Sequence, residues 1–148
     1  MDALWHLAAI KLYAIVATFL ALQALMLALW TGAVRFRRGR IVNPEDVAVV
    51  PGGKVDETDH PDVLRVKRAH QNFLENALPF FVVGFLYALT NPSLFGAQAY
   101  FYTVLGTRVL HSIFYLWGRQ PFRTISFAIG VCAIVGMAVH VLRFAYAL

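Results

Sequence analysis

Long apolar runs separated by short polar segments dominate the chain. Residues 12–30, LYAIVATFLALQALMLALW, contain a single amide, Gln23, and residues 93–117 and 125–142 are similarly apolar. A helix needs about 20 mostly apolar residues to cross a bilayer. The run at 77–89, ALPFFVVGFLYAL, is shorter than this, so its helix must begin in the polar residues before it. The pattern predicts four membrane-spanning helices at about 8–34, 63–90, 94–117 and 122–145.

Turn-forming residues separate these runs, with TNPS at 90–93 and GRQP at 118–121. Proline and glycine at such positions end helices. The first connection, 35–62, is long and polar, and its NPED motif predicts a short helix that Asn43 caps and Pro44 begins. The residues after that motif are predicted to form an irregular loop. We therefore expect an all-α protein, with one integral-membrane domain built as a four-helix bundle.

Composition and charge support a membrane location. Apolar residues make up 59% of the 148 residues and charged residues 14%, whereas soluble proteins average roughly half and a quarter. The positive charges cluster in the connections that precede the second span and follow the third. The first connection and its flanks hold Arg35, Arg37, Arg38, Arg40, Lys54, Arg65, Lys67 and Arg68, and the third connection holds Arg119 and Arg123. Because cytoplasmic loops are enriched in lysine and arginine, both connections are predicted to be cytoplasmic. A bacterial inner membrane and an endoplasmic reticulum fit equally well.

Several polar residues lie within or at the edge of the predicted spans. Arg68, Asn72 and Glu75 are spaced i, i+4, i+7, which places them on one face of the second helix, with Gln71 beside them. A simpler interpretation is an ion pair that only fixes helix register, Arg68 with Glu75 or Glu75 with Arg108. The number of polar groups exceeds what one such pair needs, so a ligand site is favoured.

A second polar face is predicted in the third span, where Arg108, His111 and Tyr115 are spaced i, i+3, i+7. Arginine facing lipid at this depth would cost at least about 2.5 kcal/mol, so Arg108 must face protein or water. In the first span, Gln23 predicts a hydrogen bond between helices.

The available side chains restrict the chemistry of such a site. The sequence has no metal-ligand spacing, no glycine-rich phosphate loop and no recognisable Ser-His-Asp or Cys-His arrangement. Arginines bind carboxylates or phosphates through paired hydrogen bonds, and a glutamate suits an ammonium group. The predicted ligand is therefore a small anionic or zwitterionic molecule that meets a lipophilic partner in the membrane. We expect no metal and no nucleic-acid partner.

Three motifs resemble a known family. RVKRAHQNFLENALPF, TRVLHSIFYL and PFRTISF, together with TGAVRFRRGRIVNPED, are similar to the membrane-associated proteins in eicosanoid and glutathione metabolism, the MAPEG family. The match touches all four spans. It is nearest to the branch of microsomal glutathione transferase 1 and microsomal prostaglandin E synthase. The resemblance implies a homotrimer of four-helix bundles, with one glutathione at each subunit interface.

The resemblance also implies roles for particular residues. Positions that match the family's glutathione site are Arg35, Arg68, Asn72, Glu75, His111, Tyr115 and Arg123, and Gln71 and Arg108 complete the predicted binding set. Arg123 would stabilise the glutathione thiolate, since a neighbouring cation lowers the pKa of a thiol. Thr124 would offer a hydroxyl beside it, and Asp46 matches an acid that lies near this arginine in the prostaglandin synthase.

The expected activity is that of a membrane-bound glutathione transferase acting on lipophilic electrophiles, with peroxidase activity towards hydroperoxides. One alternative is a glutathione-dependent isomerase of the prostaglandin E synthase kind. Compared with that synthase, Gln71 replaces an arginine, Thr124 a serine and Phe127 a tyrosine, which favours the transferase. A lipid-binding scaffold without catalysis is a second alternative, and the presence of Arg123, Glu75 and Arg68 argues against it.

The charge distribution makes a prediction about topology. With an even number of spans and cytoplasmic first and third connections, both termini lie on the opposite side of the membrane. Alkaline phosphatase fused to the C-terminus is therefore expected to be active, and green fluorescent protein at the same position to be dark. A fluorescent, phosphatase-inactive pair of fusions would refute this orientation.

Overall fold

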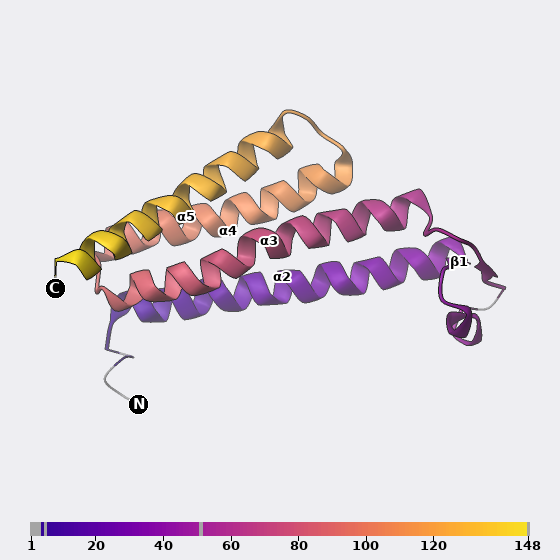
Figure 1. Ribbon diagram of the computed structural model, residues 1–148, viewed down its shortest axis with the longest axis horizontal. Helices are drawn as coiled ribbons and strands as arrows, with labels where there is room; N and C mark the ends of the chain where they lie inside the picture. The colour runs from indigo at the N-terminus through magenta and orange to yellow at the C-terminus, as the bar shows by residue number, and fades with distance from the viewer. Residues whose placement is uncertain (1–3, 5, 51, 148) are drawn as a thin grey trace.

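The computed structural model describes residues 4, 6–50 and 52–147, and four long antiparallel helices make up most of it (Figure 1). These helices are α2 (Ala8–Arg38), α3 (Pro61–Leu89), α4 (Leu94–Trp117) and α5 (Phe122–Tyr146). Between α2 and α3 lie β1 (Arg40–Ile41), the 3₁₀ helix η1 (Pro44–Ala48) and β2 (Lys54–Val55). The predicted all-α four-helix bundle is confirmed.

Local sequence explains where the helices begin and end. α2 is followed by the C-cap residue Gly39, whose φ of 61° suits glycine. Arg35, Arg37 and Arg38 lie in the last turn of α2, where positive charge interacts favourably with the helix dipole. α3 begins at Pro61, and the His60 ring nitrogen Nδ1 accepts a hydrogen bond of 3.2 Å from the Asp62 amide. The residue ranges of the four helices are thus close to those predicted for the four spans.

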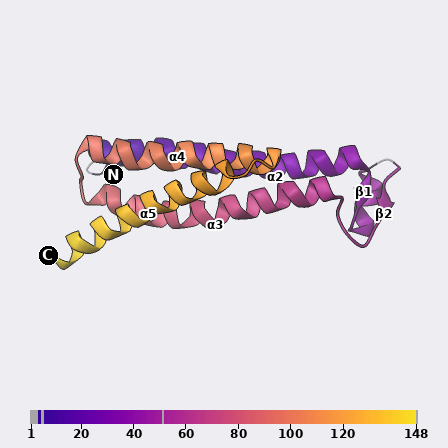
Figure 2. The same ribbon diagram turned by 90° about the horizontal axis from the view of Figure 1, so that it is seen from above.

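The four helices pack in a diamond. α3 and α4 lie on its short diagonal, because each contacts all three other helices, whereas α2 and α5 do not touch within the described residues. The start of α2, the end of α5 and the α3–α4 turn lie at one end of the bundle, and the α2–α3 connection and the α4–α5 turn lie towards the other (Figures 1 and 2). α2 and α3 extend past the α4–α5 turn.

Among the described helices, α2, α3 and α5 are long and apolar enough to cross a membrane. α4 has a matching length of 24 residues and carries Arg108 and His111 in its second half. Their side chains are buried, with 1% and 4% exposed. The ionisable side chains of α4 are therefore shielded by protein.

The helices are held by an apolar core and by one buried amide. Rings of Tyr13, Phe80, Phe101 and Tyr87 pack together at centroid distances of 5.8 to 6.0 Å. Gln23 of α2 donates from Nε2 to the Arg108 carbonyl (3.1 Å) and to Ser112 Oγ (3.0 Å) on α4. The hydrogen bond between helices predicted from Gln23 is confirmed.

The connection before α3 is more ordered than predicted. The predicted irregular loop is wrong in part, because Lys54–Val55 pairs in parallel with Arg40–Ile41. The short helix at NPED is present as η1 with Pro44 in its first turn, but Asn43 makes no capping hydrogen bond. Its amide nitrogen instead lies 3.5 Å from the Asp46 carboxylate.

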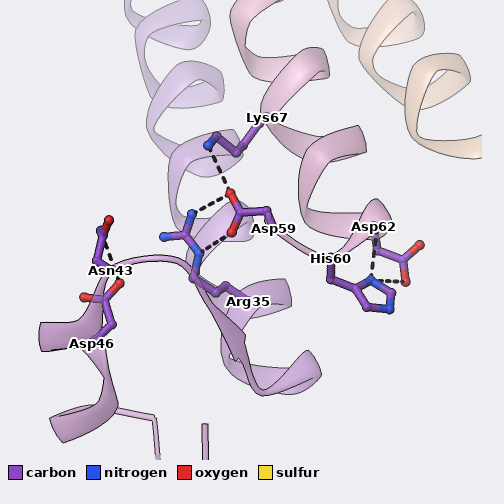
Figure 3. A network of polar contacts seen from close by, with 7 residues as sticks. All are labelled: Arg35, Asn43, Asp46, Asp59, His60, Asp62 and Lys67. Carbon is purple, nitrogen blue, oxygen red and sulfur yellow. Dashed lines mark hydrogen bonds and ion pairs between the residues drawn. The ribbon is translucent and has the colours of Figure 1, made fainter. Parts of the chain in front are cut away.

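A buried carboxylate joins this connection to two helices (Figure 3). Asp59 receives paired hydrogen bonds of 3.1 Å from Arg35 of α2 and one of 3.0 Å from Lys67 of α3. Its side chain is 3% exposed. Burial alone would raise the pKa of the Asp59 carboxyl, but the hydrogen bonds and charges of Arg35 and Lys67 outweigh it and hold the pKa below its ordinary value.

This arrangement makes the stability of the protein depend on Asp59. We expect Asp59→Asn to lower the free energy of unfolding at pH 7 by about 1.5–3 kcal/mol, as for other hydrogen bonds to charged groups. Because the folded pKa is lowered, the stabilisation is complete above the unfolded pKa, near about pH 4, and is lost as pH falls through the folded value.

Unfolding in detergent at pH 7 and at pH 3 measures both effects. The matched control is Asp56→Asn, which removes the more exposed ion pair with Arg40 and should cost about 1 kcal/mol or less. Equal effects of the two substitutions at pH 7 would contradict the role of Asp59.

Candidate functional site

Two adjoining cavities lie between α3, α4 and α5, and Asn72 and Tyr115 line both of them. Their volumes are about 250 and 190 Å³. Together they form what we call the polar groove, lined by Arg68, Gln71, Asn72, Glu75, His111, Tyr115, Arg123, Thr124 and Phe127. The two helical stripes seen in the sequence thus face each other across one groove, and the start of α5 closes its end.

The α3 wall of the groove carries both signs of charge. Arg68 and Glu75 are exposed, and Gln71 donates from Nε2 to Glu75 Oε1 at 3.2 Å. Within the described residues, neither Arg68 nor Arg108 lies within 4.0 Å of a carboxylate. The alternative ion pairs considered for Glu75 are therefore not formed in the structure.

Two buried polar atoms of the groove lack protein partners. They are Asn72 Oδ1 and His111 Nε2. The other ring nitrogen of His111, Nδ1, lies 2.9 Å from the Arg123 carbonyl. A carbonyl accepts hydrogen bonds, so Nδ1 carries the proton, and in the neutral ring Nε2 is an acceptor. Since buried polar groups normally have partners, these two acceptors indicate a site for a polar ligand.

Arg123 is held by its neighbours rather than by a counter-ion. Its guanidinium lies 4.8 Å from the centre of the Tyr115 ring, a cation–π contact. The Gln120 amide oxygen accepts from Arg123 Nε at 3.2 Å, and the amide nitrogen donates to Thr124 Oγ1 at 3.0 Å, the orientation that satisfies both ends of this amide. Thr124 then keeps its hydroxyl hydrogen for another acceptor.

The groove therefore favours an anion. Its lining holds two arginines and one glutamate, and within the described residues no carboxylate lies within 4.0 Å of Arg123. The described residues also contain no group of three His, Cys, Asp or Glu side chains that could hold a metal ion.

Three of the predicted site residues lie outside the groove within a single chain. Arg108 donates from Nη2 to the carbonyls of Ser126 (3.3 Å) and Phe127 (3.4 Å), with its guanidinium buried between α4 and α5. Arg35 is paired with Asp59, although its Nη1 makes no bond in that pair. Asp46 lies in η1, beside Asn43 (Figure 3).

Sequence reasoning missed Gln120, which contacts both Arg123 and Thr124. It lies in the GRQP segment, whose composition indicates only a turn. The one available signal was its position, three and four residues before two predicted catalytic residues. Asp59 was missed because it is one of several acids in the run DETDHPD.

Comparison with known proteins identifies the family of the chain. The model of the MAPEG family matches residues 13–143. Prostaglandin E synthase of Macaca fascicularis is 34% identical over 135 residues, covering 90% of this chain and 88% of the relative. Microsomal glutathione S-transferase 1 of Rattus norvegicus is 37% identical over 132 residues, covering 86% and 84%.

The fold and the groove define an integral-membrane helical bundle with a polar site beside its apolar core. The chain belongs to the MAPEG family. The predicted resemblance is confirmed, including its similarity to both the synthase and the transferase.

Close packing at Gly130 makes a testable prediction about how the site is held. A Cβ atom at Gly130 of α5 would lie 2.5 Å from Arg108 Nη2 and 2.8 Å from Thr107 Oγ1 on α4. Gly130→Ala should therefore destabilise the protein by about 1–3 kcal/mol, the usual cost of overpacking. The control, Gly106→Ala, has open space and should be neutral or stabilising by about 0.5–1 kcal/mol.

Thermal unfolding of the two variants in detergent measures the difference. If Gly130→Ala unfolds at the same temperature as Gly106→Ala, the Arg108 guanidinium is not confined against α5.

Proposed function

We propose that the protein is a membrane-bound glutathione transferase that activates the glutathione thiol for attack on lipophilic electrophiles. The observation that carries the proposal is the polar groove, where Arg68, Glu75 and Arg123 from two helices line adjoining cavities. Relatives named as a glutathione S-transferase and as prostaglandin E synthases support it.

The charges of the groove complement those of glutathione. The tripeptide carries two carboxylates and one ammonium group, so it is net negative, whereas the groove lining has two arginines and one glutamate. In this proposal Arg68 pairs with a carboxylate and Glu75 with the ammonium. The buried acceptors Asn72 Oδ1 and His111 Nε2 suit N–H groups of the ligand.

Arg123 is proposed to act on sulfur. A cation beside a thiol lowers its pKa, so the proton leaves to water and the thiolate remains at neutral pH. The hydroxyl hydrogen of Thr124 is free to donate to that sulfur, because Gln120 occupies the hydroxyl oxygen. The thiolate then attacks an electrophilic carbon, a C–S bond forms, and the leaving group departs with its electron pair.

A homotrimer would complete the site. Arg68, Gln71 and Glu75 are exposed in the single chain, at a depth where polar groups in lipid are costly. A second copy packed against this face would shield them, and could bring Arg35 and Asp46, which lie outside the groove of their own chain, to a neighbouring groove. The connection between α2 and α3 is proposed to face the cytoplasm, because of its arginines and lysines.

The same thiolate could support two related reactions. Attack of the thiolate on a hydroperoxide would break the O–O bond and give an alcohol and glutathione sulfenic acid. A second glutathione would then attack that sulfur and give glutathione disulfide and water, which is peroxidase activity. Similarity to the prostaglandin E synthases favours a glutathione-dependent isomerase as the second candidate. Gln71 and Phe127, which replace an arginine and a tyrosine of the synthase pattern, favour the transferase over that isomerase.

The proposal is tested with purified protein, glutathione and a hydrophobic aryl halide. Conjugation should be measurable, and Arg123→Ala should lose about 100-fold or more in rate, a typical loss on removing a group that stabilises developing charge. Glutathione binding should persist in this variant, since Arg68 and Glu75 are unchanged.

Arg119→Ala is the matched control, because it removes a neighbouring exposed arginine that lines neither cavity. Its rate should stay within about twofold of the unmodified protein. If the intact protein isomerises prostaglandin endoperoxide but conjugates no aryl halide, the isomerase takes the place of the transferase. If it shows neither activity, the non-catalytic scaffold takes the place of the transferase.

A further inference from the structure

A second charged cavity lies between α2, α3 and α4. It has a volume of about 510 Å³ and forms where α2 and α3 extend past the end of α4 at Trp117 (Figure 1). Its lining includes Arg37 and Arg38 of α2, Asp62 and Arg65 of α3, and the indole rings of Trp30 and Trp117. We call it the head pocket, and it shares no residue with the polar groove.

The head pocket has an excess of positive charge. Arg38 forms an ion pair with Asp62. Within the described residues, no carboxylate lies within 4.0 Å of Arg37 or Arg65. Three arginines and one aspartate therefore line one cavity, and two of the arginines lack a counter-ion. Phosphate and carboxylate groups are the natural partners of such a set.

Tryptophan marks the depth of this pocket in the membrane. Trp30 and Trp117 are 48% and 70% exposed and lie on the same end of the bundle as the arginine-rich connection. Indole rings prefer the headgroup region, where the ring is partly apolar and the N–H is hydrated. The arginines of the head pocket are thus placed at the level of lipid phosphates rather than in bulk water.

An apolar groove continues from the head pocket into the membrane. This tail groove, of about 390 Å³, lies between α2 and α4 and is lined by Phe19, Met26, Val109 and other apolar residues. Leu116 lines both the head pocket and the tail groove, which makes them neighbours. From Phe19 to Trp30 the surface extends 11 residues along α2, or about 16 Å at 1.5 Å per residue.

The tail groove also contains one unsatisfied polar atom. Gln23 is 8% exposed, and its amide nitrogen donates hydrogen bonds to α4. Its amide oxygen, Oε1, is buried without a partner. Gln23 and Ser112 are bonded to each other, and the other residues of the lining are apolar. The groove is therefore shaped for a long apolar segment.

From this combination we infer that the head pocket and tail groove bind one anionic phospholipid, with its phosphate at Arg37 and Arg65 and an acyl chain along the α2–α4 groove. Basic pockets between helices on the arginine-rich side of membrane proteins bind such headgroups. The charged head pocket adjoins the apolar tail groove, just as the phosphate of this lipid adjoins its acyl chain. The inference is independent of the proposed glutathione chemistry, because it uses none of the same residues.

Quenching of tryptophan fluorescence by brominated lipids tests the inference. The sequence has three tryptophans, so Trp5→Phe leaves Trp30 and Trp117 as reporters, and both line the head pocket. The protein is reconstituted in phosphatidylcholine vesicles that contain increasing brominated phosphatidylglycerol or brominated phosphatidylcholine. The anionic lipid should quench at a roughly 25-fold lower mole fraction, because each of the two arginines contributes about fivefold at an anionic surface.

Arg37→Gln/Arg65→Gln should reduce this preference to about twofold or less. The matched control, Arg40→Gln/Lys54→Gln, removes two cations of the same connection that lie outside the head pocket and should keep the preference. An equal loss of the preference for anionic lipid in both double variants would mean that diffuse attraction to the charged surface, and not a specific site, causes the preference. Release of quenching by soluble glycerol phosphate would identify a site for a free anion instead. No quenching by either lipid would mean that a second copy of the chain covers the groove.

Discussion

The structure depends on how α4 buries its polar side chains, because Arg108 and His111 find partners for only some of their nitrogen atoms within the described residues. Arg108 donates to the carbonyls of Ser126 and Phe127, and His111 Nδ1 bonds to the carbonyl of Arg123, so both side chains are bound to the α5 backbone. Exposure of either side chain to lipid would be costly, so the alternative arrangements of α4 and α5 are disfavoured. Gly130 allows the close approach that the Arg108 guanidinium requires.

This constraint also determines where the groove residues lie. Because His111 bonds to the Arg123 carbonyl, the start of α5 is fixed against α4, and the Arg123 guanidinium comes to rest over the Tyr115 ring. Gln120 then orients Arg123 and Thr124 together. The contacts that hold α4 against α5 thus also form one wall of the polar groove. α3 contributes the opposite wall through Arg68, Asn72 and Glu75.

The sequence predicted the face of each helix better than its partners. The spacing of Arg68, Asn72 and Glu75 placed them on one stripe, and the structure has all three lining the groove. Arg108 shares a stripe with His111 and Tyr115, yet it is buried between α4 and α5 rather than lining the groove. Periodicity gives the direction of a side chain around a helix, whereas the neighbour that covers it at a given height depends on tertiary packing. For the same reason the pairing of Arg35 with Asp59, and the short β1–β2 pairing, could not be read from spacing.

The most direct test of the account is the binding of glutathione to the purified protein, measured by isothermal titration calorimetry. The account predicts saturable binding with one site per subunit. Arg68→Gln should weaken it by about tenfold or more, since a charged hydrogen bond contributes about 1.5–3 kcal/mol. Arg143→Gln, far from the groove near the end of α5, should bind like the unmodified protein. Absence of saturable binding, or an equal loss in both variants, would contradict the assignment of the polar groove as the glutathione site.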